Sequence, residues 1–274
     1  MPKILSAHDA VRQYIHDGDT VTFGGFASGL MHPESILRAL EERARNGEGP
    51  HGLTALYAAG QGDSDSRGLN HLGVEGLCRR VIGGHWGLSP KLGRLCAENK
   101  LAGYNLPQGV IAQLFRDIAA GKPGVITHVG LGTFVDPRLE GGKLNDAARA
   151  AGDVVKLIEL EGEEKLFYPA IPIQVAILRA SYADTRGNCT FQREGVYAEA
   201  LAQAQPARNP GGTVIVQVER IVEHGSLDPR PVRLPGTYVD ALAEAPPEAH
   251  MHTFGTRYTP PSTPAARATR RPRP

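Results

Sequence analysis

Apolar residues in the first half of the chain follow two alternating patterns. Short runs rich in β-branched and aromatic residues, typical of buried strands, are separated by segments in which apolar residues recur every three or four positions, typical of amphipathic helices. The strand-like runs occupy residues 20–25, 53–59, 79–84, 101–105 and 124–127, and the helix-like segments occupy 6–15, 33–46, 92–99 and 109–120. Such alternation predicts an open, mostly parallel α/β sheet with helices on both of its faces.

The helical pattern is clearest between Gly109 and Ala120. One apolar stripe runs along this segment and consists of Val110, Ile111, Leu114, Phe115 and Ile118. Arg116 and Asp117 fall on the other side and are predicted to face solvent. Gln108 directly precedes the segment, where a strand end passes into the first helical turn. This position can hold an amide side chain still, but an amide does not titrate near neutral pH and is unsuited to proton transfer.

The later part of the chain is mostly strand-like. Residues 153–162, 165–169, 175–191 and 212–225 carry strand patterns, and one helix is predicted at 197–205. We expect this part to continue the same α/β body with antiparallel additions, in one domain spanning residues 1–258. Residues 259–274 contain five prolines, four arginines and no large apolar residue. They cannot bury enough surface to offset the entropy of ordering, so this tail is predicted to be disordered.

Composition excludes several classes of protein. Four of the arginines lie in the tail; without them, 26 Lys and Arg face 29 Asp and Glu, so the body carries a net charge of −3 and gives no support for nucleic-acid binding. No run of eighteen uncharged apolar residues predicts a membrane span. The three cysteines, Cys78, Cys96 and Cys189, are scattered. We expect them to be reduced and buried, in a cytoplasmic protein.

A glycine-rich loop follows the first predicted strand, in the stretch 21–34. Such a loop before a helix start lets ligand atoms approach the backbone and favours an anion. A dinucleotide fingerprint would need glycine where Phe26 stands, and no acidic residue ends the next strand, so a nicotinamide-dependent oxidoreductase is disfavoured. No Gly-Lys-Ser/Thr follows, which excludes a P-loop. A tight strand-to-helix turn without a ligand is the alternative.

Two further loops offer polar residues without a complete catalytic motif. Residues 60–71 resemble the start of a calcium loop, but Arg67 and Val74 occupy ligand positions, so a polar loop at a ligand-binding sheet edge is the better interpretation. His85 could serve as a base, although two glycines before an aromatic pair more often mark a packed strand end. Metal-ligand clusters and a serine nucleophile elbow are both missing from the sequence.

Taken together, these stretches resemble the class I coenzyme A transferases. The carrying motifs are GGF at 24–26 with HPE at 32–34, and GGHWGLSP, YNLPQGV, KPGVIT, GLGTFVDPR, GGKLN and FYPAIPIQVAILRASYADTRGN. They run in order from about Leu5 to Tyr258 and are most similar to the acetate/propionate type, in which two homologous halves form one polypeptide. Two details depart from the commonest form: one extra residue precedes Pro33, and Thr22 replaces an apolar residue.

The resemblance implies a ping-pong reaction between an acyl-CoA and a small carboxylate. A glutamate attacks the thioester, and an anhydride and then a glutamyl-CoA thioester form on it. Coenzyme A is a substrate here, and no cofactor or metal is implied. By this resemblance Gln108, in Pro-Gln-Gly, contributes to the oxyanion hole, and Gly24, Gly25 and Phe26 line the substrate pocket. Gly130 and Gly132, in a second glycine-rich loop, are assigned to the same pocket.

The expected nucleophile is missing from the sequence. In the family it stands in a Glu-Asn-Gly or Glu-Ser-Gly motif of the carboxyl-terminal half, and the Glu-Gly pairs of this chain lack that context: Glu75, Glu140, Glu161 and Glu194. The chain therefore resembles the amino-terminal half of a transferase that needs either a β-type subunit or the second half of a truncated fused enzyme; the motifs favour truncation. We expect a homo- or hetero-oligomer. A catalytically inactive acyl-CoA-binding or regulatory subunit is the alternative.

Overall fold

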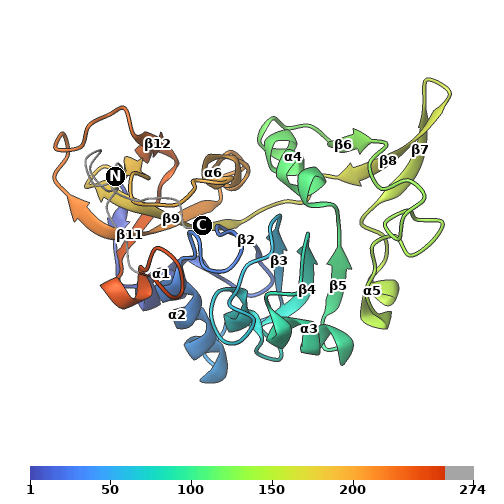
Figure 1. Cartoon of the computed structure of the whole chain (residues 1–274), viewed down its shortest axis with the longest axis horizontal. Helices are drawn as coiled ribbons and strands as arrows, with labels where there is room; N and C mark the ends of the chain where they lie inside the picture. Colours follow the sequence, from blue (N-terminus) through green and yellow to red (C-terminus); the bar gives the residue numbers. More distant parts are fainter. Residues whose placement is uncertain (257–274) are drawn as a thin grey trace, which may run out of the picture.

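The computed structural model describes residues 1–256, and its centre is one large, mostly parallel sheet (Figure 1). Eight strands follow one another in the order β1, β13, β11, β9, β2, β3, β4, β5, and each pairs in parallel with its neighbour. Their bounds are β1 Lys3–Ile4, β2 Thr20–Phe23, β3 Leu53–Tyr57, β4 Cys78–Gly83, β5 Ala102–Asn105, β9 Val175–Asp184, β11 Thr213–Val222 and β13 Ala241–Glu244. Two short antiparallel strands, β10 Cys189–Thr190 and β12 Val232–Leu234, complete the sheet beside β9.

Helices cover both faces of this sheet, as the sequence predicts. They are α1 Ala7–Tyr14, α2 Glu34–Arg45, α3 Pro90–Ala97, α4 Gln108–Ala119, α5 Asp146–Ala151 and α6 Ala200–Arg208, with 3-10 turns η1 Leu69–Leu72, η2 Gly236–Tyr238 and η3 Pro247–Ala249. Alternate residues of β9 point to opposite faces. Val175 and Ile177 join a core with α1, α2 and α3, whereas Ala176 and Leu178 join a core with α4 and α6.

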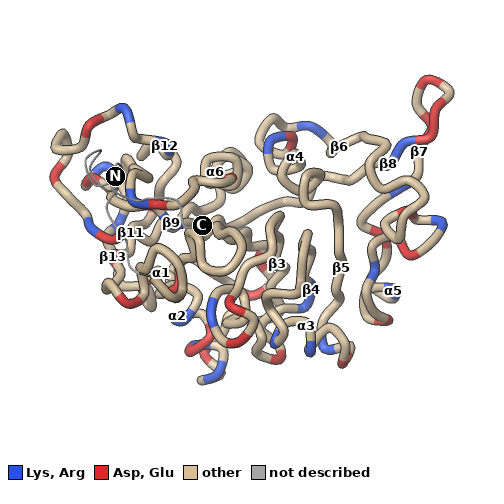
Figure 2. Tube along the Cα trace, viewed as in Figure 1, with Lys and Arg blue, Asp and Glu red and all other residues tan. Residues whose placement is uncertain are grey.

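A second sheet stands apart from the first and is antiparallel (Figure 1). It contains β6 Gly124–Thr127, β8 Glu163–Pro169 and β7 Lys156–Leu160, in that order. Figure 2 shows acidic residues gathered at the β7–β8 tip. The predicted antiparallel additions are confirmed, but the expectation that residues 124–127 extend the parallel sheet is wrong. Strand periodicity shows which face is buried and carries no information about which strand becomes the partner.

Two local expectations need correction. Asp117 is buried, because its carboxylate accepts hydrogen bonds from Gln113 Nε2 at 3.1 Å and Lys122 Nζ at 3.0 Å. The helix predicted at 197–205 begins and ends three residues later, at Ala200 and Arg208.

Other expectations are met where the structure can test them. The three cysteines are free and buried, as predicted. Within residues 1–256, no helix has the length and apolar content needed to cross a membrane. The predicted tail, 259–274, lies outside the described residues.

Candidate functional site

The loops that carry the predicted site meet at one edge of the large sheet. Strands β2, β3, β4 and β5 are adjacent and parallel, so their carboxyl ends lie side by side. In open α/β sheets this edge is where ligands bind. Residues 24–33, 58–68 and 84–89 and the turn before α4 follow these four strands and line the edge (Figure 1).

The loop after β2 is a compact, strained turn. Phe26 N donates to Leu30 O at 2.8 Å and Leu30 N returns a hydrogen bond to Phe26 O at 3.1 Å. Ala27 and Met31 adopt φ of 52° and 59°, a region that side chains with a β-carbon rarely occupy. Phe26 remains 38% exposed at the rim. Unfavourable backbone angles held by surrounding contacts are frequent at functional sites.

Gln61 ties this loop to its neighbours. Its Nε2 donates to Phe23 O at 3.0 Å, and the next residue, Gly62, donates its backbone N–H to Ala27 O at 3.3 Å. Ser89, after β4, donates Oγ–H to Gln61 O at 2.7 Å. Three loops are thus held together around one buried amide. The sequence analysis missed Gln61, although Gly60-Gln61-Gly62 places an amide between glycines as Pro107-Gln108-Gly109 does.

Gln108 lies at the same edge and is exposed. It is the first residue of α4, after Pro107. Its backbone lies against Gly84: a β-carbon at residue 84 would be 3.0 Å from Gln108 Cα and 2.1 Å from Ala58 O. No larger residue fits there, so glycine at 84 lets α4 approach the ends of β3 and β4. The amide can therefore donate to a group bound at the edge, beside the positive end of the α4 dipole.

The predicted pocket glycines occupy two places. Gly24 packs on Leu178, and Gly25 lies against His32 and Gln61, at the edge that also bears Gln108. Gly130 instead packs on Tyr168 of β8, whose hydroxyl donates to Val129 O at 2.8 Å. Gly132 follows in the same turn and donates its N–H to Asp136 Oδ2 at 2.9 Å. Gly130 and Gly132 thus lie beside the smaller sheet, away from the loops after β2 and β3.

Thr22, the residue that departs from the resemblance, is fully buried and satisfied. Gln203 of α6 directs its Nε2 to both Thr22 Oγ1 and Phe23 O, each at 3.0 Å. His85 is exposed at the same edge, and a β-carbon at residue 60 would lie 2.4 Å from its Nδ1. Among residues 1–256, no group of three or more His, Cys, Asp or Glu is placed to hold a metal ion.

A buried ionic cluster supports the loop from below. Arg179 of β9 contacts Glu194 through Nε at 3.2 Å and through its second terminal nitrogen at 3.1 Å, and His250 Nε2 lies 3.4 Å from the same carboxylate. Burial raises the pKa of Glu194, but the hydrogen bond from His250 and the charge of Arg179 outweigh it and hold the pKa below its usual value. Burial lowers the pKa of His32 to about 4, so this ring is neutral. Its carbonyl accepts from Arg179 at 3.4 Å.

A second cluster joins the loop after β3 to α2. His71 lies between two carboxylates: Nε2 is 2.9 Å from Glu34 Oε1, and Nδ1 contacts Glu41. Glu34 also accepts from Gly68 N at 3.0 Å. Burial alone would lower the pKa of His71, but the hydrogen bonds and charges of the two glutamates outweigh it and raise the pKa above 6.5.

The protonated His71 is expected to stabilise the fold in a pH-dependent way. Because its pKa is raised in the folded state, this stabilisation is complete below about pH 6.5 and is lost as pH rises through the folded-state pKa. Urea unfolding of the chain and of a His71→Gln variant from pH 6 to 9 should show the difference in unfolding free energy shrinking with pH. A difference that stays constant or grows would contradict this.

The Gly25 backbone should tolerate no side chain. It has φ of 145°, and a β-carbon would lie 2.6 Å from His32 Cδ2 and 2.7 Å from Gln61 Oε1. We expect Gly25→Ala to destabilise the fold by about 1–3 kcal/mol, measured by urea unfolding. Gly93→Ala is the matched control, since nothing lies within 4 Å of that position on α3. It should be neutral or stabilising. Equal effects of the two changes would contradict the proposed tightness of the loop.

Comparison with known proteins identifies the family. The family described as Coenzyme A transferase matches residues 4–245. The chain belongs to the coenzyme A transferase family. The match covers the whole large sheet and all the loops at its carboxyl edge.

Individual members of the family place the chain more closely. It is 39% identical over 249 residues to the acetate CoA-transferase YdiF of Escherichia coli (strain K12), covering 91% of this chain and 46% of that protein. It is 44% identical over 262 residues to the caffeate CoA-transferase of Acetobacterium woodii, covering 95% and 49%. The crystal structure of the YdiF apoenzyme from Escherichia coli O157:H7 superposes with a TM-score of 0.88 at 38% identity, covering 93% and 48%.

The chain therefore spans about half the length of these curated relatives and corresponds to their amino-terminal half. One of the separate subunits of a two-subunit relative has a comparable length. It belongs to the succinyl-CoA:3-ketoacid coenzyme A transferase of Xanthomonas campestris pv. campestris (strain B100) and is 31% identical, with 91% of both chains covered.

Within this coenzyme A transferase half, none of the Glu-Gly pairs offers a free carboxylate beside Gln108. Glu194 is 1% exposed and held by Arg179. Glu75 pairs with Lys100 at 2.9 Å and Glu140 with Arg149 at 3.0 Å, both on the surface. Glu161 lies in the β7–β8 turn with φ of 52°.

Proposed function

We propose that this chain is the oxyanion-hole half of a short-chain acyl-CoA:carboxylate CoA-transferase of the acetate/propionate type. The observation that carries the proposal is the exposed amide of Gln108 at the carboxyl edge of the sheet, beside Gly84 and near the loop 24–31. The length and identity shared with the fused relatives support it.

The reaction would need a carboxylate nucleophile from a second half, either a β-type subunit or a carboxyl-terminal segment. A glutamate oxygen of that half attacks the thioester carbon, and the carbonyl π electrons move to oxygen. The Gln108 amide donates a hydrogen bond to this oxyanion. The oxyanion then collapses, the carbon–sulfur bond breaks, and CoA leaves as a thiolate. An amide has no proton to lose near neutral pH, so the donor persists through every step.

The two ends of the substrate would meet different surfaces. The strained turn at residues 24–26, with its exposed aromatic ring, offers an apolar wall for a short acyl group, and its glycines let the acyl group approach the backbone. The donor Gln108 comes from a different loop at the same edge. The acyl preference would depend on both halves, since one methylene changes binding by only about 1–3 kcal/mol.

The proposal is tested by restoring the missing half. The chain is combined with a β-type half, and CoA transfer from propionyl-CoA to acetate is measured. We expect turnover only from the combination, and mass spectrometry of the trapped glutamyl-CoA thioester should locate it on the added half. A thioester on this chain, or turnover by this chain alone, would refute the assignment. Acyl-CoA binding without turnover in any combination would instead indicate a regulatory subunit.

A further inference from the structure

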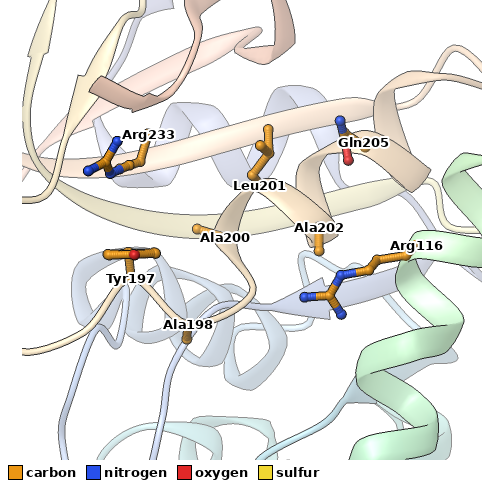
Figure 3. Close-up of a pocket in the computed structure, with 8 residues that line it drawn as sticks. All are labelled: Arg116, Tyr197, Ala198, Ala200, Leu201, Ala202, Gln205 and Arg233. Carbon is orange, nitrogen blue, oxygen red and sulfur yellow. The ribbon is translucent and has the colours of Figure 1, made fainter. Parts of the chain in front are cut away.

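A pocket of about 280 Å³ opens between α4 and α6 and is outside the loops described above (Figure 3). Arg116 enters it from α4, and Arg233 lies at its other end, near Tyr197. Between them the wall is formed by Leu201, Ala202 and Gln205 of α6. The pocket therefore has a small, mostly apolar wall with a guanidinium at each end.

Neither guanidinium is neutralised within the part of the chain that the structure describes. Arg116 donates to Ala112 O at 2.9 Å, and Arg233 lies over the Tyr197 ring at 5.7 Å, but no carboxylate of residues 1–256 lies within 4 Å of either charge. The neighbouring Asp117 is occupied by Lys122. No acidic residue lines the pocket. Two uncompensated guanidinium groups around one pocket favour an anion, and their planar geometry matches phosphate.

Both walls of the pocket connect to the proposed reaction site. Gln108, Ala112 and Arg116 are spaced four residues apart, so they follow one another along one side of α4. Eight residues of helix separate Gln108 from Arg116 by about 12 Å. The hydrogen bond to Ala112 turns the Arg116 guanidinium back toward Gln108.

The second wall, α6, is fixed at both ends. Gln203 binds Phe23 O, directly before the turn at residues 24–26. At its far end Asn209 donates to Ala119 O of α4 at 2.7 Å. The pocket is thus held in register with the loops that would receive the thioester.

We propose that this pocket binds the phosphate-bearing end of the acyl-CoA substrate while the thioester lies at Gln108. The inference rests on the proposed function. The pantetheine arm separates the phosphates of CoA from its sulfur, as the α4 helix separates Arg116 from Gln108. The volume of about 280 Å³ is just below the lower limit of roughly 300 Å³ for sites that enclose a whole small molecule, so the pocket suits one end of a longer ligand.

Calorimetric titration of the chain with CoA and with pantetheine tests this directly. Arg116→Gln and Arg233→Gln should each raise the dissociation constant for CoA about tenfold, and the double variant about a hundredfold. Pantetheine, which lacks the phosphates, should bind more weakly than CoA and equally to all variants. Arg230→Gln is the matched control, because this arginine is 89% exposed in its side chain, pairs with Asp228 and is outside the pocket.

The outcomes separate this inference from the proposed function. Unchanged CoA binding by the double variant, equal binding of CoA and pantetheine, or no CoA binding by the unsubstituted chain would each overturn it. If the double variant keeps CoA affinity and loses association with a β-type half, the pocket is a protein contact and the inference is wrong. Failure of the proposed function appears elsewhere, as missing turnover in the reconstituted enzyme of unsubstituted sequence.

Discussion

Replacement of Gln108 by alanine is expected to lower kcat of the reconstituted transferase by about 10²–10³, the usual effect of losing one oxyanion donor. The side chain is exposed at the carboxyl edge of the sheet, and its backbone is held by the close contact with Gly84. The change removes a donor used mainly in the transition state, so KM should change much less than kcat. Steady-state kinetics with acyl-CoA and a carboxylate acceptor measure both parameters.

The matched control for this experiment is Gln113→Ala on the same helix. Gln113 is exposed and its amide donates to Asp117, which Lys122 also contacts. Its loss should leave kcat unchanged. Gln108→Ala with full turnover, or equal losses in the two variants, would remove the oxyanion role from Gln108. Unaltered circular dichroism and urea unfolding of both variants would exclude a folding defect as the cause.

The second large effect is expected on stability, from Glu194→Ala. The Glu194 carboxylate is buried with Arg179, and its removal leaves the guanidinium uncompensated in a site that is 3% exposed. Breaking such a buried pair typically costs about 3–5 kcal/mol. Urea unfolding should report a loss of this size. Because Arg179 also supports the His32 carbonyl under the loop 24–33, activity of the reconstituted enzyme should fall with it.

An exposed ion pair provides the comparison. Glu75 contacts Lys100 at 2.9 Å with both side chains largely exposed, so Glu75→Ala should leave stability almost unchanged. The double variant Glu194→Ala/Arg179→Met restores a neutral interior and should recover part of the loss. If Glu194→Ala alone behaves like Glu75→Ala, the buried cluster does not support the fold as described.

The regular elements of the fold are predictable because each depends on local periodicity. The five strand-like runs of the first half all form strands, and the helix predicted over 109–120 spans Gln108–Ala119. The burial of Asp117 was not predictable in this way, since it depends on Lys122, which lies beyond the helix end. The partner of β6 was also missed, because strand register is set by tertiary packing.

The site divides along the same line. From the residues alone came the family, the half of the enzyme that the chain represents, and Gln108 as its candidate oxyanion donor, because short co-linear motifs carry that information. Only the tertiary structure revealed Gln61 among three loops, the Arg179–Glu194 pair beneath them, and the pocket between Arg116 and Arg233. Arg179 and His32 are 147 residues apart in the chain, and only packing brings them into contact. Sequence spacing encodes the neighbours of a residue within a helix or strand, whereas contacts between elements arise from how their buried faces pack together.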